Sequence, residues 1–166
     1  MISQTMQQAI NAQIQAEMYS SNLYLSMAAY CESIAMRGAA HWMRIQASEE
    51  TAHALKFFEY VIQRNGRSLV QSVGAPPQEW KALRDMFEQA LAHEKQVTGL
   101  IYKLYEQALA EKDYATQNLL QWFISEQVEE EANTTEIVAK LQMIGESSNA
   151  LFWVDKELGK RGASQS

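Results

Sequence analysis

The first 37 residues of the chain contain neither glycine nor proline, the two residue types that most often interrupt a helix. The whole sequence of 166 residues has only seven glycines and two prolines. Apolar residues recur with a helical period through most of the chain. This pattern predicts an all-α fold of long helices, and the length is sufficient for one domain with a substantial core.

Breaks in the helical pattern divide the chain into four long helices and one short helix. The expected helices are residues 4–33, 39–65, 80–112, 113–145 and 149–158. The connection between the second and third, residues 66–79, reaches about 46 Å when extended, and a helix of this size is about 40 Å long. We therefore predict a single domain over residues 1–166: a four-helix bundle at about 4–144, made of two antiparallel hairpins with one long crossover, the short fifth helix, and a flexible tail at 159–166.

Charge and cysteine content exclude several classes of function. The net charge of −6 argues against a nucleic-acid partner and is compatible with a cation as ligand. The lone Cys31 cannot form an internal disulfide or an all-cysteine metal site. No apolar run of 18 residues predicts a membrane span, and the N-terminus lacks the features of a signal peptide. We expect a cytoplasmic protein without a membrane partner.

Glu17 lies at the centre of the apolar face of the first helix. It is the only charged residue among the first 31, and no Lys or Arg precedes Arg37. A buried carboxylate without a partner costs several kcal/mol or becomes protonated. Ordinary packing therefore does not explain Glu17.

The other three long helices carry similar polar residues near their midpoints. Glu50 and His53 are three residues apart and share a face of the second helix. Glu94 interrupts the apolar face of the third helix, and Gln127 and Glu130 lie together on the fourth. By itself a Glu-x-x-His pair is a weak signal, but residues at the middle of four bundled helices converge at one level. Five strong ligands there, Glu17 included, suit two ions of iron or manganese.

Short segments throughout the chain resemble the bacterial non-haem ferritins. They are residues 16–21 with Tyr24, residues 49–53, His93 with Glu94, residues 121–131 and residues 154–158. The resemblance covers nearly the whole chain. It implies a ferritin-like fold and an iron site in each subunit.

The resemblance also implies which residues bind iron. The first ion would bind Glu17, Glu50 and His53, and the second would bind Glu50, Glu94 and Glu130, with Gln127 close by. A third ion would use Glu130 with three further carboxylates, Glu49, Glu126 and Glu129. Tyr24 matches a tyrosine that lies beside the centre in the family, and a core aromatic is the alternative interpretation.

The family comparison further implies a hollow homo-oligomeric shell of 24 subunits with ferric mineral inside. The short last helix would line the four-fold channels, although a cap on the bundle end is an equal alternative. Bacterioferritins bind haem through a Met at the position of Thr51, so no haem is expected here. Animal ferritins have acidic residues where this chain has Gln117 and Leu120, which leaves the route of iron into the shell open.

The expected activity is that of a ferroxidase, in which Fe(II) is oxidised by dioxygen at the di-iron centre and ferric oxide-hydroxide is stored in the shell. Three alternatives remain from sequence. A rubrerythrin-like peroxidase or other di-iron oxidase would prefer a different oxidant or need a larger chain. A pure storage shell would lack fast oxidation. A DNA-protecting mini-ferritin would place its ligands across a subunit interface.

Overall fold

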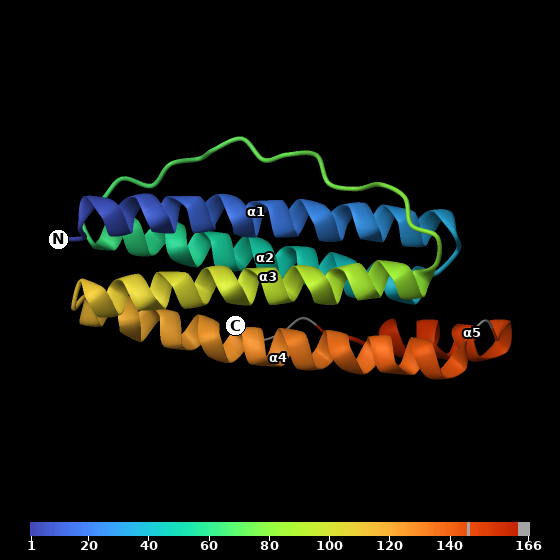
Figure 1. Ribbon diagram of the computed structural model, residues 1–166. Coiled ribbons are helices and arrows are strands. Elements are labelled where there is room, and N and C mark those ends of the chain that lie inside the picture. Colours follow the sequence, from blue (N-terminus) through green and yellow to red (C-terminus); the bar gives the residue numbers. More distant parts are fainter. Residues whose placement is uncertain (146, 163–166) are drawn as a thin grey trace.

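The computed structural model describes residues 1–145 and 147–162, and the described part of the chain is helical without strands. The helices are α1 (Gln4–Ser33), α2 (Arg37–Gln63), α3 (Leu83–Ala110), α4 (Tyr114–Ile144) and α5 (Ser148–Leu158). Four long helices lie side by side, with α5 at one end (Figure 1). None of the described helices is both long and apolar enough to cross a membrane.

The four long helices form two hairpins, as the sequence predicts. α1 packs mainly against α2, and α3 packs mainly against α4. Residues 64–82 connect the hairpins and run along the outside of α1 for the length of the bundle (Figure 1). Side chains of α1 fix this connection: Asn11 bonds to the backbone of Arg67 and Leu69, and Gln15 bonds to the carbonyl of Ser72.

Local chemistry sets the ends of the helices. Ser3 accepts a hydrogen bond from the Met6 amide at the start of α1, and the predicted N-cap Asp113 accepts one from the Thr116 amide at the start of α4. Asn65 has a φ of 58°, a left-handed conformation that stops α2.

The third helix begins later than predicted, at Leu83 and not at Trp80. Ala82 is extended, with φ −156° and ψ 164°. The Trp80 indole donates a hydrogen bond to Gln89, and its ring contacts the ring of Tyr30 edge-on at 5.2 Å. Trp80 is thus held against α1 and α3 from outside the helix, a tertiary contact that its helical spacing does not reveal.

The apolar core is divided into two clusters by a polar layer. On α1, Ile14 belongs to one cluster and Leu23 to the other, and Glu17 lies between them. On α2, Ala47 and Ala54 belong to different clusters, and Glu50 lies between them. The same division occurs on α3 and α4, so the midpoints of the four helices meet in one buried polar layer.

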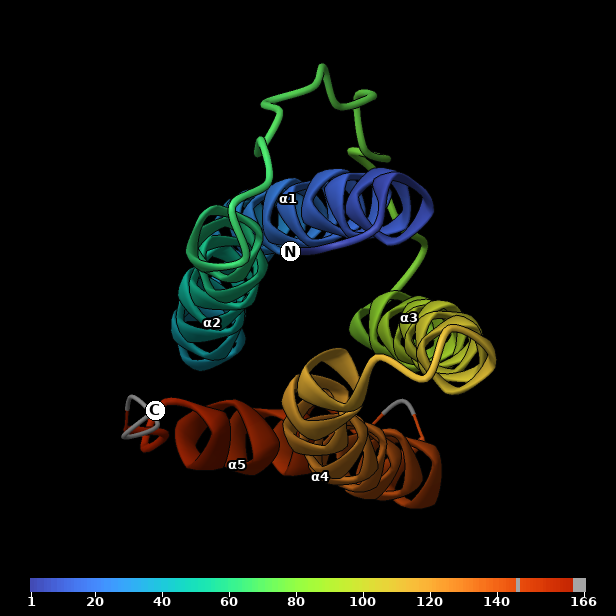
Figure 2. The same ribbon diagram turned by 90° about the vertical axis from the view of Figure 1, so that its left-hand side faces the viewer.

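α5 crosses below the bundle from α4 toward α2 (Figure 2). The Ala39 amide of α2 donates to Asp155 Oδ1 at 2.8 Å. Gly38 permits this approach because a Cβ on it would lie 1.7 Å from the Asp155 carbonyl oxygen. The sequence predicts a flexible tail at residues 159–166. Gly159, its first residue, lies against Gly38. Residues 163–166 lie outside the described residues.

Replacing Gly38 by alanine is expected to lower the free energy of unfolding by about 1–3 kcal/mol, because the backbone of α5 must move. Gly99→Ala is the matched control: Gly99 is also helical, and nothing lies within 4 Å of its added Cβ. Alanine there is expected to stabilise the helix by roughly 0.5–1 kcal/mol. Thermal unfolding of both variants checks this, and a Gly38→Ala protein as stable as the wild type would contradict the close approach.

Candidate metal centre

Three potential ligands of the polar layer surround one small space. Glu17 of α1 and Glu50 and His53 of α2 each offer one ligand atom, and these atoms all lie within 4.8 Å of one another. All three side chains are buried. His53 Nδ1 lies 3.4 Å from Glu50 Oε2. Two carboxylates and an imidazole in this arrangement can hold one cation.

Glu17 provides the test of whether a cation fits. Its Oε1 accepts a hydrogen bond from Gln13 Nε2 at 2.7 Å. Its Oε2 is the one buried side-chain oxygen or nitrogen among residues 1–145 and 147–162 that has no hydrogen-bond partner. Leaving such an atom unpaired costs free energy. Oε2 is therefore available as a metal ligand.

Glu94 of α3 is held in the same layer by two neighbours. The Tyr24 hydroxyl of α1 donates to Glu94 Oε1. Gln127 Nε2 of α4 donates to Glu94 Oε2 at 3.2 Å and lies equally far from the Glu94 carbonyl oxygen. Tyr24 and Gln127 are themselves buried. The sequence-predicted residues of α1, α3 and α4 thus meet around this carboxylate.

Glu50 and Glu130 are joined by an amide that the sequence analysis did not single out. Gln46 Nε2 donates to Glu50 Oε1 at 3.2 Å and to Glu130 Oε2 at 2.7 Å. The two oxygens of Glu50 therefore face different groups, with Oε2 toward His53 and Oε1 toward the Glu130 side. A carboxylate that bridges two ions needs such an arrangement.

Burial and mutual repulsion raise the pKa of the four buried carboxyl groups. Burial, followed by the charge of Glu50, raises the pKa of Glu17 to about 8. Burial and then the charge of Glu94 raise the pKa of Glu130 to about 7. Burial also raises the pKa of Glu50 and, against its hydrogen bonds, that of Glu94. A bound cation stabilises the ionised forms, so metal binding at this centre releases protons.

Aromatic rings enclose His53. The rings of Trp122 and Phe123 on α4 lie edge-on to the imidazole, with centroid distances of 5.5 and 5.8 Å. Phe123 also stacks on Phe57 at 3.9 Å. These contacts fix the ring plane of His53 while its Nδ1 stays beside Glu50.

The outer carboxylates lie at the edge of the layer. Glu126 Oε2 is 4.0 Å from His53 Nε2, and Glu129 is exposed. Burial raises the pKa of Glu126, and the charges of Glu129 and Glu49 add to this effect, which places the three within electrostatic range. Glu49 Oε2 also accepts a hydrogen bond from Arg161 Nη2 at 2.5 Å. Among the predicted outer ligands, Glu49 therefore forms an ion pair with Arg161.

Comparisons with known proteins assign the family. A family model described as the ferritin-like domain matches residues 7–144. A bacterial non-haem ferritin from Bacteroides fragilis is 45% identical over 97% of this chain and 100% of its own length. The chain belongs to the ferritin family.

Further relatives of this ferritin agree with that assignment. A bacterial non-haem ferritin from Campylobacter jejuni is 42% identical over 94% of this chain and 93% of its own. A crystal structure described as a novel open-pore ferritin from the hyperthermophilic archaeon Archaeoglobus fulgidus matches with a TM-score of 0.96 and 49% identity, covering 98% of this chain and 99% of that one. The fold predicted from the sequence, a ferritin-like bundle with a long crossover and a short fifth helix, is confirmed.

Three residues of this ferritin that contact the predicted ligands escaped the sequence analysis. Gln13 precedes Glu17 by four residues, and Gln46 precedes Glu50 by four, so each amide reaches the carboxylate one turn away. The repeated Gln-x-x-x-Glu spacing was a usable signal. Arg161 had no such signal, because its contact depends on the path of the chain after α5.

Proposed function

We propose that this ferritin stores iron and limits free Fe(II), acting as a ferroxidase that oxidises Fe(II) to Fe(III) with dioxygen. The observation that carries the proposal is the buried layer of carboxylates with one imidazole, in which Glu17 Oε2 has no hydrogen-bond partner among the described residues. Iron is the substrate here, and carboxylate-rich sites with one imidazole suit it. The ferric product would be deposited as oxide-hydroxide mineral within a protein shell.

In this proposal the four long helices hold two Fe(II) ions about 3.5–4 Å apart. One ion binds Glu17, Glu50 and His53, and the other binds Glu50, Glu94 and Glu130, near Gln127. Each Fe(II) gives one electron to dioxygen, and two protons from solvent complete its two-electron reduction to hydrogen peroxide, which leaves the centre. The carboxylates favour this step because negative charge stabilises Fe(III) more than Fe(II).

Tyr24 has two proposed roles beside the centre. Its hydroxyl donates to Glu94, which orients that ligand. Burial and the charge of Glu94 raise the pKa of Tyr24 well above its ordinary value, so the phenol stays protonated and keeps this hydrogen bond. In the second role the phenol would give one electron to dioxygen and its proton to Glu94, to which it is hydrogen-bonded.

A third ion would bind at the outer carboxylates Glu49, Glu126 and Glu129 together with Glu130. Their mutual repulsion supports this part of the proposal. No haem is expected, because Thr51 occupies the position of the haem-binding Met, and its hydroxyl bonds to Ser21. The absorption spectrum of the purified protein checks that expectation.

We further propose a homo-oligomeric shell of 24 subunits working in the cytoplasm. Large apolar side chains that are exposed on the single chain support an oligomer where they lie together, since contiguous apolar patches mark protein interfaces. They include Val128 on α4 and the neighbouring Phe152 and Trp153 on α5, whose rings contact each other. All five proposed ligands of the two-ion centre come from one chain, which argues against the mini-ferritin alternative.

Anaerobic loading with Fe(II) followed by a pulse of oxygen tests the whole proposal. We expect two or three ions per subunit, rapid oxidation on the pulse, and a large hollow particle by electron microscopy and gel filtration. A monomer or small oligomer would overturn the storage function. Slow oxidation in an intact shell would instead support pure storage, and faster turnover with peroxide would support a peroxidase.

A further inference from the structure

The chain beyond α5 lies against the first half of α2, where Arg161 contacts His41 and Trp42. Asp155 caps the Ala39 amide, and a Cβ on Gly159 would lie 3.2 Å from Gly38 Cα. One turn further along α2, His41 Nε2 lies 2.9 Å from the Arg161 carbonyl oxygen. These contacts direct the side chain of Arg161 along α2 toward the polar layer.

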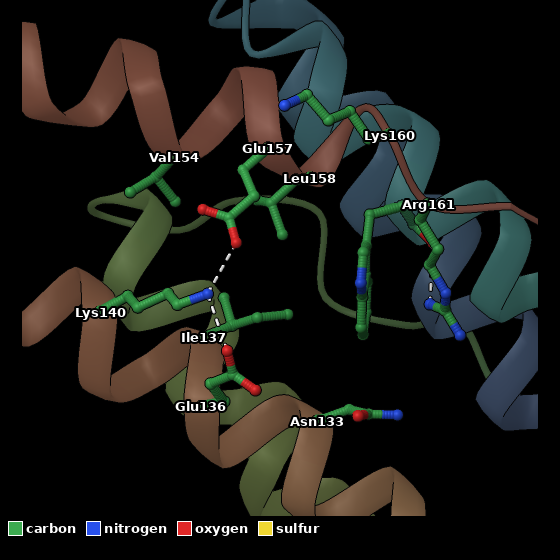
Figure 3. Close-up of a pocket in the computed structure, with 10 residues that line it drawn as sticks. Asn133, Glu136, Ile137, Lys140, Val154, Glu157, Leu158, Lys160 and Arg161 are labelled. Atoms are coloured by element: carbon green, nitrogen blue, oxygen red, sulfur yellow. Dashed lines mark hydrogen bonds and ion pairs between the residues drawn. The ribbon is translucent and has the colours of Figure 1, made fainter.

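The guanidinium of Arg161 makes several specific contacts there. Nη1 donates to Gln46 Oε1 at 2.8 Å, and Nη2 donates to Glu49 Oε2 at 2.5 Å. The guanidinium carbon lies 4.3 Å from the centre of the Trp42 ring, and Nη1 also donates to the Trp42 carbonyl. Only 16% of the side chain is exposed. Figure 3 shows Arg161 at one side of a cavity of about 370 Å³ between α2, α4 and α5.

These contacts determine the orientation of the Gln46 amide. A guanidinium only donates hydrogen bonds, so the oxygen of Gln46 must face Arg161. The amide nitrogen then faces the other way, toward Glu50 and Glu130, where it donates to both. An amide without this partner could turn over, and its oxygen would then repel the two carboxylates.

We propose that Arg161 is a positioning residue of the metal centre, acting through Gln46 to hold Glu50 and Glu130 in the geometry that binds the second ion. This role rests on the proposed function. Each carboxylate oxygen has two lone pairs, so Glu50 and Glu130 can accept from Gln46 and still bind metal. Groups that orient metal ligands in this way typically change metal affinity by about 10–100-fold when they are removed.

The direction of the effect separates this role from simple charge repulsion. Arg161 is a cation near a site for cations, so removing its charge would by Coulomb's law make metal binding tighter. Loss of positioning makes metal binding weaker instead. The two explanations therefore predict opposite changes in the dissociation constant of the second ion.

The test is an anaerobic titration of the assembled protein with Co(II), whose visible absorption reports its ligands. We expect the wild-type protein to bind two ions at the centre, and Arg161→Met to bind the second of these roughly tenfold or more weakly, with an altered spectrum. Equal or tighter binding by Arg161→Met would overturn the positioning role while leaving the two-ion centre intact. A wild-type protein that binds no ion pair would overturn the proposed function itself.

Three further variants make the test specific. Gln46→Met keeps the length of the side chain, and Arg161→Met should have little added effect in that background, because both act through one amide. Arg161→Lys keeps the charge but not the fork that reaches Gln46 and Glu49 together, so it should not restore affinity. Lys160 points away from Arg161 in Figure 3, and Lys160→Met should bind both ions like the wild type. Additive effects, rescue by lysine, or a loss in Lys160→Met would each overturn the proposal.

Discussion

Replacing Glu50 by alanine is expected to abolish fast oxygen-dependent oxidation of Fe(II), lowering the initial rate by roughly a hundredfold or more. This loss corresponds to about 2.7 kcal/mol at the transition state. Glu50 is the carboxylate whose two oxygens face the two halves of the centre, toward His53 and toward Glu130 through Gln46. Without it, two ions lose their shared ligand and their fixed separation.

Stopped-flow absorbance after mixing the Fe(II)-loaded protein with oxygen measures this rate. Glu59→Ala is the matched control, because Glu59 is an exposed carboxylate on the same helix and its removal changes the net charge equally. It should oxidise Fe(II) like the wild type. Gel filtration and circular dichroism establish that each variant folds and assembles. A fast phase that survives in Glu50→Ala would show that the chemistry occurs elsewhere.

The sequence predicts most of the centre because helical periodicity is regular. Glu17 was found because a lone charge lay in an apolar stripe, and the structure places it between two apolar clusters. Glu94 and Gln127, predicted on separate helices, lie in contact. The roles of these residues as iron ligands remain predictions, for which the experiments above provide tests.

The parts that the sequence did not predict depend on contacts between distant segments. The spacing of Trp80 predicts a helical position, but contacts with Tyr30 and Gln89 hold it outside the helix. The sequence does not predict a role for Gln46, because a polar residue near a carboxylate is common and its partners on other helices are not visible in the sequence. Arg161 lies in a stretch expected to be a flexible tail, and only the approach of Gly38 to Asp155 places it beside α2.

The stability of the metal-free protein is expected to fall as the pH rises from 6.5 to 8. The folded-state pKa values of Glu17 and Glu130, about 8 and about 7, lie above the ordinary value of 4.5. The folded protein therefore binds more protons than the unfolded chain in this range, so raising the pH favours unfolding. Loss of the protons of Glu17 and Glu130 between pH 6.5 and 8 should together lower the free energy of unfolding by on the order of 2 kcal/mol, since one pKa unit corresponds to about 1.4 kcal/mol.

Groups that act in the opposite direction contribute little between pH 6.5 and 8. Burial lowers the pKa of His93 from 6.5 to about 4, so its contribution to stability rises with pH and is nearly complete at pH 6.5, where the unfolded histidine has lost half of its protons. The pKa of Asp113 is lowered from 3.8 even though burial opposes the shift, because Arg64 and Thr116 stabilise its charge, and its stabilising effect is lost only in acid. Between pH 6.5 and 8 the unfolded His93 loses its remaining half proton, which opposes the fall by only about 0.4 kcal/mol, and Asp113 does not change charge in either state.

Bound ions should reverse the slope, and this reversal is the sharper prediction. An ion needs ionised carboxylates, so its affinity and the stability that it adds both rise with pH. Thermal unfolding at one subunit concentration, with chelator or with excess Zn(II), measures both slopes. Glu17→Gln should make the metal-free slope less steep but not remove it, because the amide does not titrate and Glu130 still does. If the stability of the metal-free protein stayed constant or rose over this range, the raised pKa values would be contradicted. This test concerns only proton uptake by the buried carboxyl groups, so it does not depend on which ion the centre binds.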